Sequence, residues 1–368
     1  MTDVGGQRAA EAVERAAEAV ERVVADAARV LRAAARRDWD GTRAGSLEWS
    51  CRRAAEHLAG ALLAYAGQLA GRGRHTDRYA PLGPAVDEGA DPAGLLDVLE
   101  TTGTLLAMAV RTTPPRARAF HPFPFGSANG EGFAAMGVTE TLLHTYDIAT
   151  GFGLAYEPDG RLAEFALTRI FPKVRPGPAP WPTLLWATGR GGLHGREPVT
   201  EWMWTNSLVI PAGRLTLEGV TPAAAADLAV GGNGGFDWVE GGPYEGTREA
   251  AAMTLKAYET GVHRPEFGLF VLVREEDARA VGGMGFHGPP DEDGRTEIGY
   301  DLATSARGRG YATEALRALS EWALARTDVR SLFATVEPAN LPSQRVVARA
   351  GFRRVAAEDE LFAYELRG

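Results

Sequence analysis

The sequence predicts two domains, an all-α N-terminal half followed by a mixed α/β half. A chain of 368 residues is long for one hydrophobic core. Apolar residues recur at helical spacing through most of residues 7–171, whereas after residue 213 short apolar runs alternate with glycine-rich turns and amphipathic helices. Because residues 172–212 are rich in proline and glycine, we place the boundary near 208–213, giving domains 1–208 and 213–368.

Composition narrows the class of protein. A hydrophobic fraction of 45% and a charged fraction of 24% are typical of a soluble globular chain. A formal net charge of -9 argues against a general nucleic-acid binder. Cys51 is the single cysteine, so an intrachain disulfide is excluded. We expect Cys51 to be a core residue of a protein in a reducing cytoplasm. We see no signal peptide and no stretch long enough to span a bilayer, so we expect a cytoplasmic protein with no membrane partner.

The first half predicts helices separated by Gly- and Pro-rich loops. The second helix has Ser46 as a candidate N-cap, and the third begins with an Asp91-Pro92 pair suited to a helix start. The predicted helices are 7–37, 46–69, 91–111, 132–150 and 162–171. Residues 71–93 and 113–132 are predicted to be loops.

The second half contains the most informative motif. A strand over 297–303 is followed by the glycine-rich turn 307–312 and then by an amphipathic helix that continues to about Arg326. Glycines before a helix let the backbone approach a ligand closely, and the first helical turn presents unpaired N–H groups at the positive end of the dipole. The turn therefore suits a diphosphate.

This turn resembles the R-x-x-G-x-A turn of the GCN5-related N-acetyltransferases, which bind acetyl-CoA there. Asn340 and Ser343, with Gly351-Phe352 after the next helix, resemble the family's second cofactor-side segment. The resemblance covers about 213–368, with its first strand at 214–220 and its central hairpin at 270–273 and 281–286. Its ribosomal-protein-acetyltransferase-like branch implies an α/β fold with a mixed, mostly antiparallel sheet.

The resemblance also implies site residues. Glu297 would be the general base, with Asp301 and His287 as weaker candidates, and Ser343 would hydrogen-bond the cofactor or relay protons. Many members of this family use a tyrosine as the general acid that protonates the leaving thiolate. Val347 stands at that position here and cannot donate a proton. The residues that would bind acetyl-CoA are Leu302, Ala303, Arg307, Gly308, Arg309, Gly310, Tyr311, Ala312, Thr313 and Asn340.

The first half has a candidate metal site. Glu140 and His144 lie four residues apart, on one helix face, and His57 lies on an earlier helix. Two imidazoles and one carboxylate form a known catalytic zinc set that leaves a fourth position open. From spacing alone, a solvated Glu/His pair and an unrelated histidine remain the alternative.

Trp49-Ser50, His57-Leu58 and the E-x-x-x-H-x-x-D pattern from Glu140 to Asp147 resemble the DinB-like four-helix-bundle family. Within that family, the sequence resembles the mycothiol-dependent maleylpyruvate isomerases and related thiol transferases. The resemblance implies that His57, Glu140 and His144 bind Zn²⁺ or another divalent metal, with Asp147 orienting His144. Such a metal would bind a small thiol, for example mycothiol, as the thiolate.

Three functions follow from these patterns. The leading hypothesis is an acetyl-CoA-dependent N-acetyltransferase, in which a primary amine of a small molecule or a protein N-terminus attacks the thioester directly. The first alternative is a metal- and mycothiol-dependent thiol transferase or isomerase in the N-terminal half. The second is a non-catalytic ligand sensor. The sequence leaves open the acceptor and the oligomeric state, a homodimer included.

Overall fold

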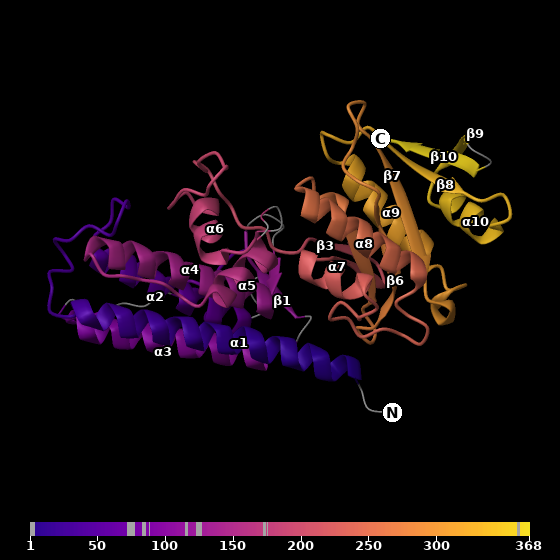
Figure 1. The fold of residues 1–368 in the computed structure, drawn as a ribbon. Helices are drawn as coiled ribbons and strands as arrows, with labels where there is room; N and C mark the ends of the chain where they lie inside the picture. Colours follow the sequence, from indigo (N-terminus) through magenta and orange to yellow (C-terminus); the bar gives the residue numbers. More distant parts are fainter. Residues whose placement is uncertain are drawn as a thin grey trace. The chain divides into compact units, whose positions relative to one another are not determined.

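The computed structural model describes the chain except for residues 1–3, 72–77, 83–85, 88, 115–116, 123–126, 172–173, 175 and 359–360. Two compact units divide between Asn206 and Ser207 (Figure 1). The N-terminal unit is mainly helical, and the C-terminal unit is built on one mixed sheet.

The helical unit contains six α-helices within the described residues. They are α1 Val4–Leu31, α2 Cys51–Ala70, α3 Pro92–Thr112, α4 Gly130–Gly151, α5 Gly160–Ile170 and α6 Pro180–Ala187. Two features differ from the prediction. Helix α6 lies where we expected only a linker, and the short antiparallel strands β1 Arg118–Phe120 and β2 Ser127–Asn129 pair within the predicted loop 113–132.

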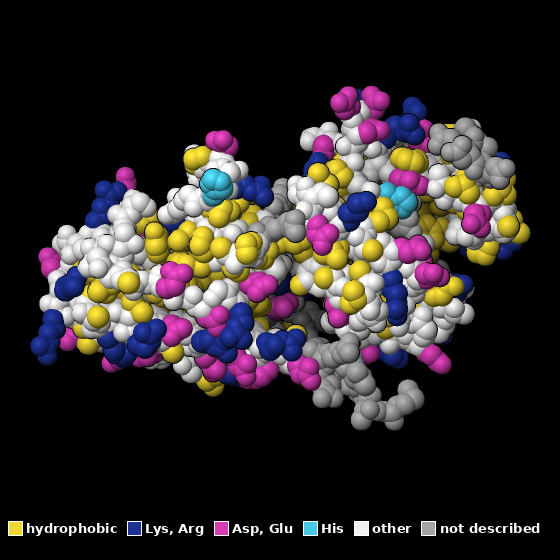
Figure 2. Space-filling view, viewed as in Figure 1, with side chains coloured by type: hydrophobic (Ala, Val, Ile, Leu, Met, Phe, Trp, Pro, Cys, Tyr) yellow, Lys and Arg dark blue, Asp and Glu magenta, His cyan; other side chains and the backbone are white. Residues whose placement is uncertain are grey.

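Helices α1 to α5 share one hydrophobic core. Helix α4 is buried along almost its whole length, because α2, α3 and α5 pack around it. Charged side chains line the surface along α1 and α3 (Figure 2), where Arg32 pairs with Asp97 and Glu100. These exposed pairs contribute little stability, so burial of the apolar faces holds the helices together.

Helix α3 corrects one expectation from the sequence. It is long and apolar enough to meet a length and composition criterion for a membrane span, contrary to our statement that no segment is. Its apolar positions include Leu95, Leu96, Leu99 and Leu106, which are fully buried among the other helices. Packing in the core of the helical unit accounts for that apolar face.

The start of α2 also differs from the prediction. The helix begins at Cys51, and the hydroxyl of Ser50 accepts a hydrogen bond from the N–H of Arg53 at 3.2 Å. Ser46, the predicted N-cap, is an exposed loop residue four positions earlier. Cys51 itself is fully buried, in agreement with the predicted core role.

Ser50→Ala is therefore expected to destabilise the helical unit by about 1 kcal/mol, because one N–H of the first turn of α2 loses its acceptor. Ser46→Ala is the matched control and should leave stability unchanged. Urea unfolding followed by circular dichroism measures both. Equal stability of the two variants would contradict this assignment of the cap.

The C-terminal unit is an eight-stranded sheet in the order β3-β4-β5-β6-β7-β8-β10-β9. All neighbours are antiparallel except β7 and β8, which are parallel, so the predicted mixed, mostly antiparallel sheet is confirmed. The strands are β3 Val209–Ala212, β4 Leu215–Gly219, β5 Leu269–Arg274, β6 Ala280–Phe286, β7 Arg295–Leu302, β8 Ser331–Val336, β9 Arg353–Glu358 and β10 Leu361–Arg367.

Helices cover both faces of this sheet, which is why β5 is buried at consecutive positions. Helices α7 and α8 share a hydrophobic cluster with β5 and β6. Helix α9 contacts β3, β4, β7 and β8, and α10 packs on α9 and β8. These helices are α7 Pro222–Ala229, α8 Glu245–Thr260, α9 Tyr311–Leu324 and α10 Leu341–Arg349.

The prediction missed several elements of this unit. Helices α7 and α8 and the strands β9 and β10 were not predicted. Segment 208–213, which we assigned to the boundary, contains β3. The Ile210-Pro211 pair made this segment look like a linker and not a strand. Proline is tolerated there because β3 lies at the edge of the sheet, where the outer side of the strand has no partner strand that needs an N–H donor.

Strands β7 and β8 diverge, and the wedge between them is the feature of the fold that positions the site (Figure 1). In the described residues their parallel register covers only Arg295 to Glu297 on β7 and Ser331 to Phe333 on β8. The rest of β7 pairs with β6 alone. One edge of β7 is consequently left without a partner strand from Ile298 to Leu302.

Candidate functional site

The glycine-rich turn lies between the end of β7 and the start of α9. Gly308 and Gly310 have φ of +75° and +85°, a conformation that other residues rarely adopt. Gly310 is the N-cap of α9, and a Cβ on Gly308 would meet nothing within 4 Å. The turn therefore presents the N–H groups of Tyr311, Ala312 and Thr313 without a capping side chain in front of them.

An ion pair lies against this turn. Arg214 Nη2 lies 2.7 Å from Glu314 Oε2 and donates to the carbonyl of Arg309 at 3.0 Å, and its guanidinium stacks over the ring of Tyr311. The carboxylate of Glu314, in the first turn of α9, is thus already paired with Arg214. The side chain of Arg307 folds back, with its Nε donating to the carbonyl of Leu302, instead of facing the turn.

The wedge exposes backbone donors that differ in part from those predicted. Ala303 donates its N–H to the carbonyl of Val281 at 2.9 Å, so this predicted donor is not free. Because hydrogen bonds alternate along an antiparallel pair, odd positions of β7 face β6 and even positions face β8. The N–H groups that face the wedge therefore belong to Tyr300 and Leu302.

A cavity of about 350 Å³ lies beside β6 and β7 on the side covered by α8. Gly283, Gly285 and Gly299 line it, and a Cβ on them would collide with Thr247, with the backbone of Gly268 and with the ring of His287, respectively. Asp301 also lines the cavity, but its carboxylate accepts hydrogen bonds from Thr247 and from the N–H of Gly283. Asp301 therefore ties α8 to the sheet.

Glu297 forms an ion pair with His287, which the sequence placed in a loop. His287 Nδ1 lies 2.9 Å from Glu297 Oε2, and Thr335 donates its hydroxyl to Glu297 Oε1 at 2.7 Å. The hydrogen bond with His287 lowers the pKa of Glu297, and the same hydrogen bond raises the pKa of His287 against the effect of burial. Glu297 is thus a weaker base than a free carboxylate.

The first turn of α10 carries the remaining predicted residues. Asn340 is its N-cap, and its Oδ1 accepts from the N–H of Ser343 at 3.1 Å. Tyr300 reaches from β7 and donates its hydroxyl to the carbonyl of Ser343 at 3.3 Å. Val347 is fully buried and offers no proton, in agreement with the sequence. Asn340 and Ser343 thus lie beside the wedge with Tyr300 between them and β7.

The family comparison covers this unit. Residues 214–353 match the family model of the acetyltransferase (GNAT) domain. This region is a GNAT acetyltransferase domain. The wedge, the glycine-rich turn and the cavity all lie within the matched residues.

Named relatives match part of the GNAT domain. The chain is 41% identical over 86 residues to the uncharacterized N-acetyltransferase YjdG of Bacillus subtilis (strain 168), which is 23% of this chain and 51% of the relative. It is 34% identical over 84 residues to the uncharacterized N-acetyltransferase p20 of Bacillus licheniformis, covering 23% and 47%. The chain thus spans about half the length of these curated relatives.

Solved structures are also similar to this unit. An acetyltransferase from Agrobacterium tumefaciens str. C58 is 27% identical, with a TM-score of 0.32, and the match covers 47% of this chain and all of that one, 100%.

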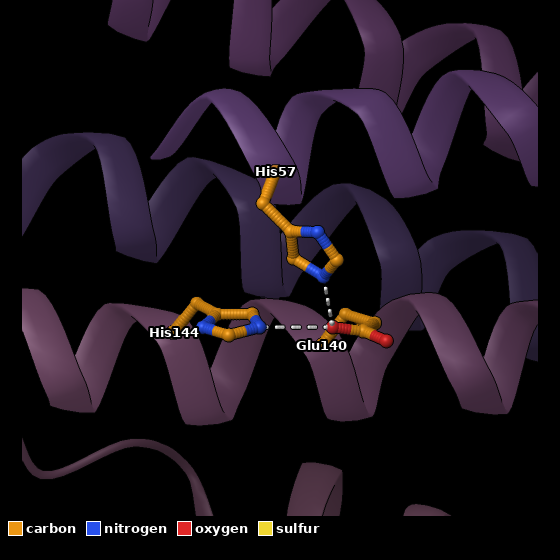
Figure 3. Close-up of side chains that lie close together, drawn as sticks. All are labelled: His57, Glu140 and His144. Atoms are coloured by element: carbon orange, nitrogen blue, oxygen red, sulfur yellow. Dashed lines mark ion pairs between the residues drawn. The ribbon is translucent and has the colours of Figure 1, made fainter. Parts of the chain in front are cut away.

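The helical unit brings the three predicted metal ligands together (Figure 3). Glu140 Oε2 lies 3.1 Å from His144 Nε2 and 3.7 Å from His57 Nε2, and all three ligand atoms lie within 4.8 Å of one another. Metal bonds of about 2.0–2.1 Å at tetrahedral angles place ligand atoms roughly 3.3 Å apart. The three side chains therefore suit one small cation with little rearrangement.

Neighbouring side chains fix the orientation of these ligands. Trp49 contacts both imidazole rings, and Tyr65 donates its hydroxyl to the other oxygen of Glu140 at 3.3 Å. Burial opposes the charge on Glu140, but its two histidine partners outweigh that effect and lower its pKa to about 2. Glu140 is thus ionised in this cluster.

Asp147 lies between the cluster and Arg190. Its Oδ2 is 3.4 Å from His144 Nδ1, and Arg190 Nη2 is 2.9 Å from the same oxygen. Burial of His144 opposes its charge, but Asp147 and Glu140 raise its pKa to about 9. The family resemblance implied a role for Asp147, whereas Arg190 lies 43 residues further along the chain and had no local signal.

Proposed function

We propose that the GNAT domain transfers the acetyl group of acetyl-CoA to a primary amine. The observation that carries this proposal is the uncapped start of α9 at the open edge of β7. A diphosphate would accept from the N–H groups of Tyr311, Ala312 and Thr313 and would lie at the positive end of the α9 dipole. Gly308 and Gly310 leave the backbone accessible to it.

The wedge would hold the rest of the cofactor. The N–H groups of Tyr300 and Leu302 are donors for the amides of the pantetheine arm and for the thioester oxygen. A preorganised donor to a developing oxyanion contributes about 3 kcal/mol to stabilisation of the transition state. Asn340 and Ser343 supply further polar groups at the α10 side of the wedge.

The amine would enter through the cavity beside α8. It must lose a proton from its ammonium form before its lone pair attacks the carbonyl carbon. The C–N bond then forms, the C–S bond breaks and CoA leaves as the thiolate, which takes the second proton of the nitrogen and becomes the thiol. The acidic lining residues Glu249 and Asp301 favour a cationic acceptor, either a small molecule or a protein N-terminus.

Release of CoA from acetyl-CoA tests this proposal. The acceptors would be tripeptides with an N-terminal serine or alanine, together with ethanolamine, phenethylamine and spermidine. At least one amine is expected to accelerate thiol release well above the amine-free rate and to gain the mass of an acetyl group. Tight binding of acetyl-CoA without release for any amine would favour the alternative, a non-catalytic sensor.

We further propose that the helical unit is a DinB-like domain that binds a divalent cation, Zn²⁺ first, through His57, Glu140 and His144. The specific observation that favours it is the convergence of the three ligand atoms. When bound, the metal would hold a small thiol such as mycothiol as its thiolate, for S-transfer or isomerisation. Trp49 and Tyr65 would keep the ligands in place, and Asp147 with Arg190 would hold His144.

A further inference from the structure

His287, which the sequence offered only as a weaker candidate for the base, lines the cavity beside α8. His287 follows β6 and donates its backbone N–H to the carbonyl of Glu297 at 3.0 Å, so it lies directly opposite Glu297 on the neighbouring strand. His287 lines the cavity, whereas Glu297 does not. Its side chain is 47% exposed, compared with 21% for Glu297.

The carboxylate of Glu297 is turned away from the acceptor. One oxygen pairs with His287 Nδ1 and the other accepts from the hydroxyl of Thr335 on β8. Each oxygen of Glu297 therefore already has one partner within the protein. Glu297 is therefore placed to orient the imidazole, in the way that a carboxylate fixes the tautomer of a catalytic histidine.

The other imidazole nitrogen lies over Gly299, which also lines the cavity. His287 Nε2 lies 2.8 Å from where a Cβ on Gly299 would stand, so any side chain at Gly299 would collide with it. Glycine at this position gives the ring its place on the strand surface. With the proton on Nδ1 directed at Glu297, Nε2 keeps a lone pair that can accept a proton.

We propose that His287, held by Glu297, is the group that removes the proton from the acceptor amine. This inference rests on the proposed acetyl transfer. His287 Nε2 accepts one proton from the ammonium nitrogen, which leaves the amine lone pair free to form the C–N bond. The imidazolium is stabilised by Glu297 until the proton passes to water. Glu297 then acts as a positioning residue and not, as the sequence suggested, as the base.

The pH dependence follows from the charges around the ring. Glu297 on β7 faces Nδ1, and Asp301 on β7 and Glu249 on α8 line the same cavity; the described lining residues include no Lys or Arg. Glu297 raises the pKa of His287 above 6.5, so activity should rise with pH above that value. Removal of the Glu297 charge lowers the pKa of His287, and the rise should move to lower pH.

The experiment compares wild-type protein with His287→Gln, Glu297→Gln and Gly299→Ala. The most productive amine of the panel is used at saturating acetyl-CoA, from about pH 5 to about pH 9. The titration of the amine is the same for every protein and cancels in the comparison. The imidazole signal that disappears in His287→Gln is followed by NMR, and calorimetry with acetyl-CoA verifies the cofactor site.

We expect His287→Gln to lower kcat/KM about 100-fold or more with unchanged acetyl-CoA affinity. Glu297→Gln should keep more activity, shift the pH profile to lower pH and lower the pKa of the His287 imidazole in the NMR titration. Gly299→Ala should fall between them. Wild-type activity in His287→Gln, or a uniform loss in Glu297→Gln with an unmoved imidazole pKa, would overturn the inference. Wild-type protein inactive toward every amine would instead refute the proposed function.

Discussion

Gly310→Trp is expected to weaken acetyl-CoA binding at least 100-fold. The residue stands at φ +85° at the N-cap of α9, where a Cβ would lie 3.6 Å from Arg214 Nη2 and beside the N–H groups of the first helical turn. An indole there would occupy the place of the diphosphate and remove several charge-assisted hydrogen bonds, each worth about 1.5–3 kcal/mol. Isothermal calorimetry with acetyl-CoA measures the loss.

Gly261→Trp is the matched control. Gly261 ends α8 with φ +78°, and nothing lies within 4 Å of its Cβ position. Both variants therefore carry the same left-handed backbone strain, but Gly261 is not part of the turn. Acetyl-CoA affinity should be unchanged in Gly261→Trp. Wild-type affinity in Gly310→Trp, with the same melting temperature as the control, would show that the diphosphate binds elsewhere.

Purified protein is expected to carry up to one zinc ion per chain, and His57→Ala/His144→Ala is expected to carry almost none. The double variant leaves one carboxylate in place of three converging ligands, which should lower zinc affinity by more than 100-fold. Elemental analysis of protein prepared without chelators gives the occupancy. Competition with a chromophoric chelator gives the affinity.

His194→Ala is the control for this experiment. His194 is an exposed histidine of the same unit, outside the cluster, so its loss should leave zinc content unchanged. Equal and near-zero zinc in wild-type protein and in the double variant would remove the metal proposal. That result would leave Glu140 as a carboxylate held between two histidines for structural reasons alone.

The sequence alone predicted those features that depend on residues close together along the chain. The turn 307–312 was found because glycines and the first turn of a helix are neighbours in sequence, and Glu140 and His144 because four residues make about one helical turn. The long helices followed from the spacing of their apolar residues. Shorter elements were missed, among them β3 with its Pro211 and the helices α7 and α8, because local propensity is weak and packing against a sheet decides them.

Sequence by itself determined the two halves of this protein, the candidate anion-binding turn and the candidate metal ligands, because each depends on residues that are close along the chain or on family motifs. Only the tertiary structure decided which groups meet across strands. It paired Glu297 with His287 and Thr335, joined Arg190 to Asp147, and assigned the free backbone donors to Tyr300 and Leu302 in place of Ala303. The physical reason is that strand register and side-chain contacts between distant segments are fixed by the packed core, and no local pattern encodes them.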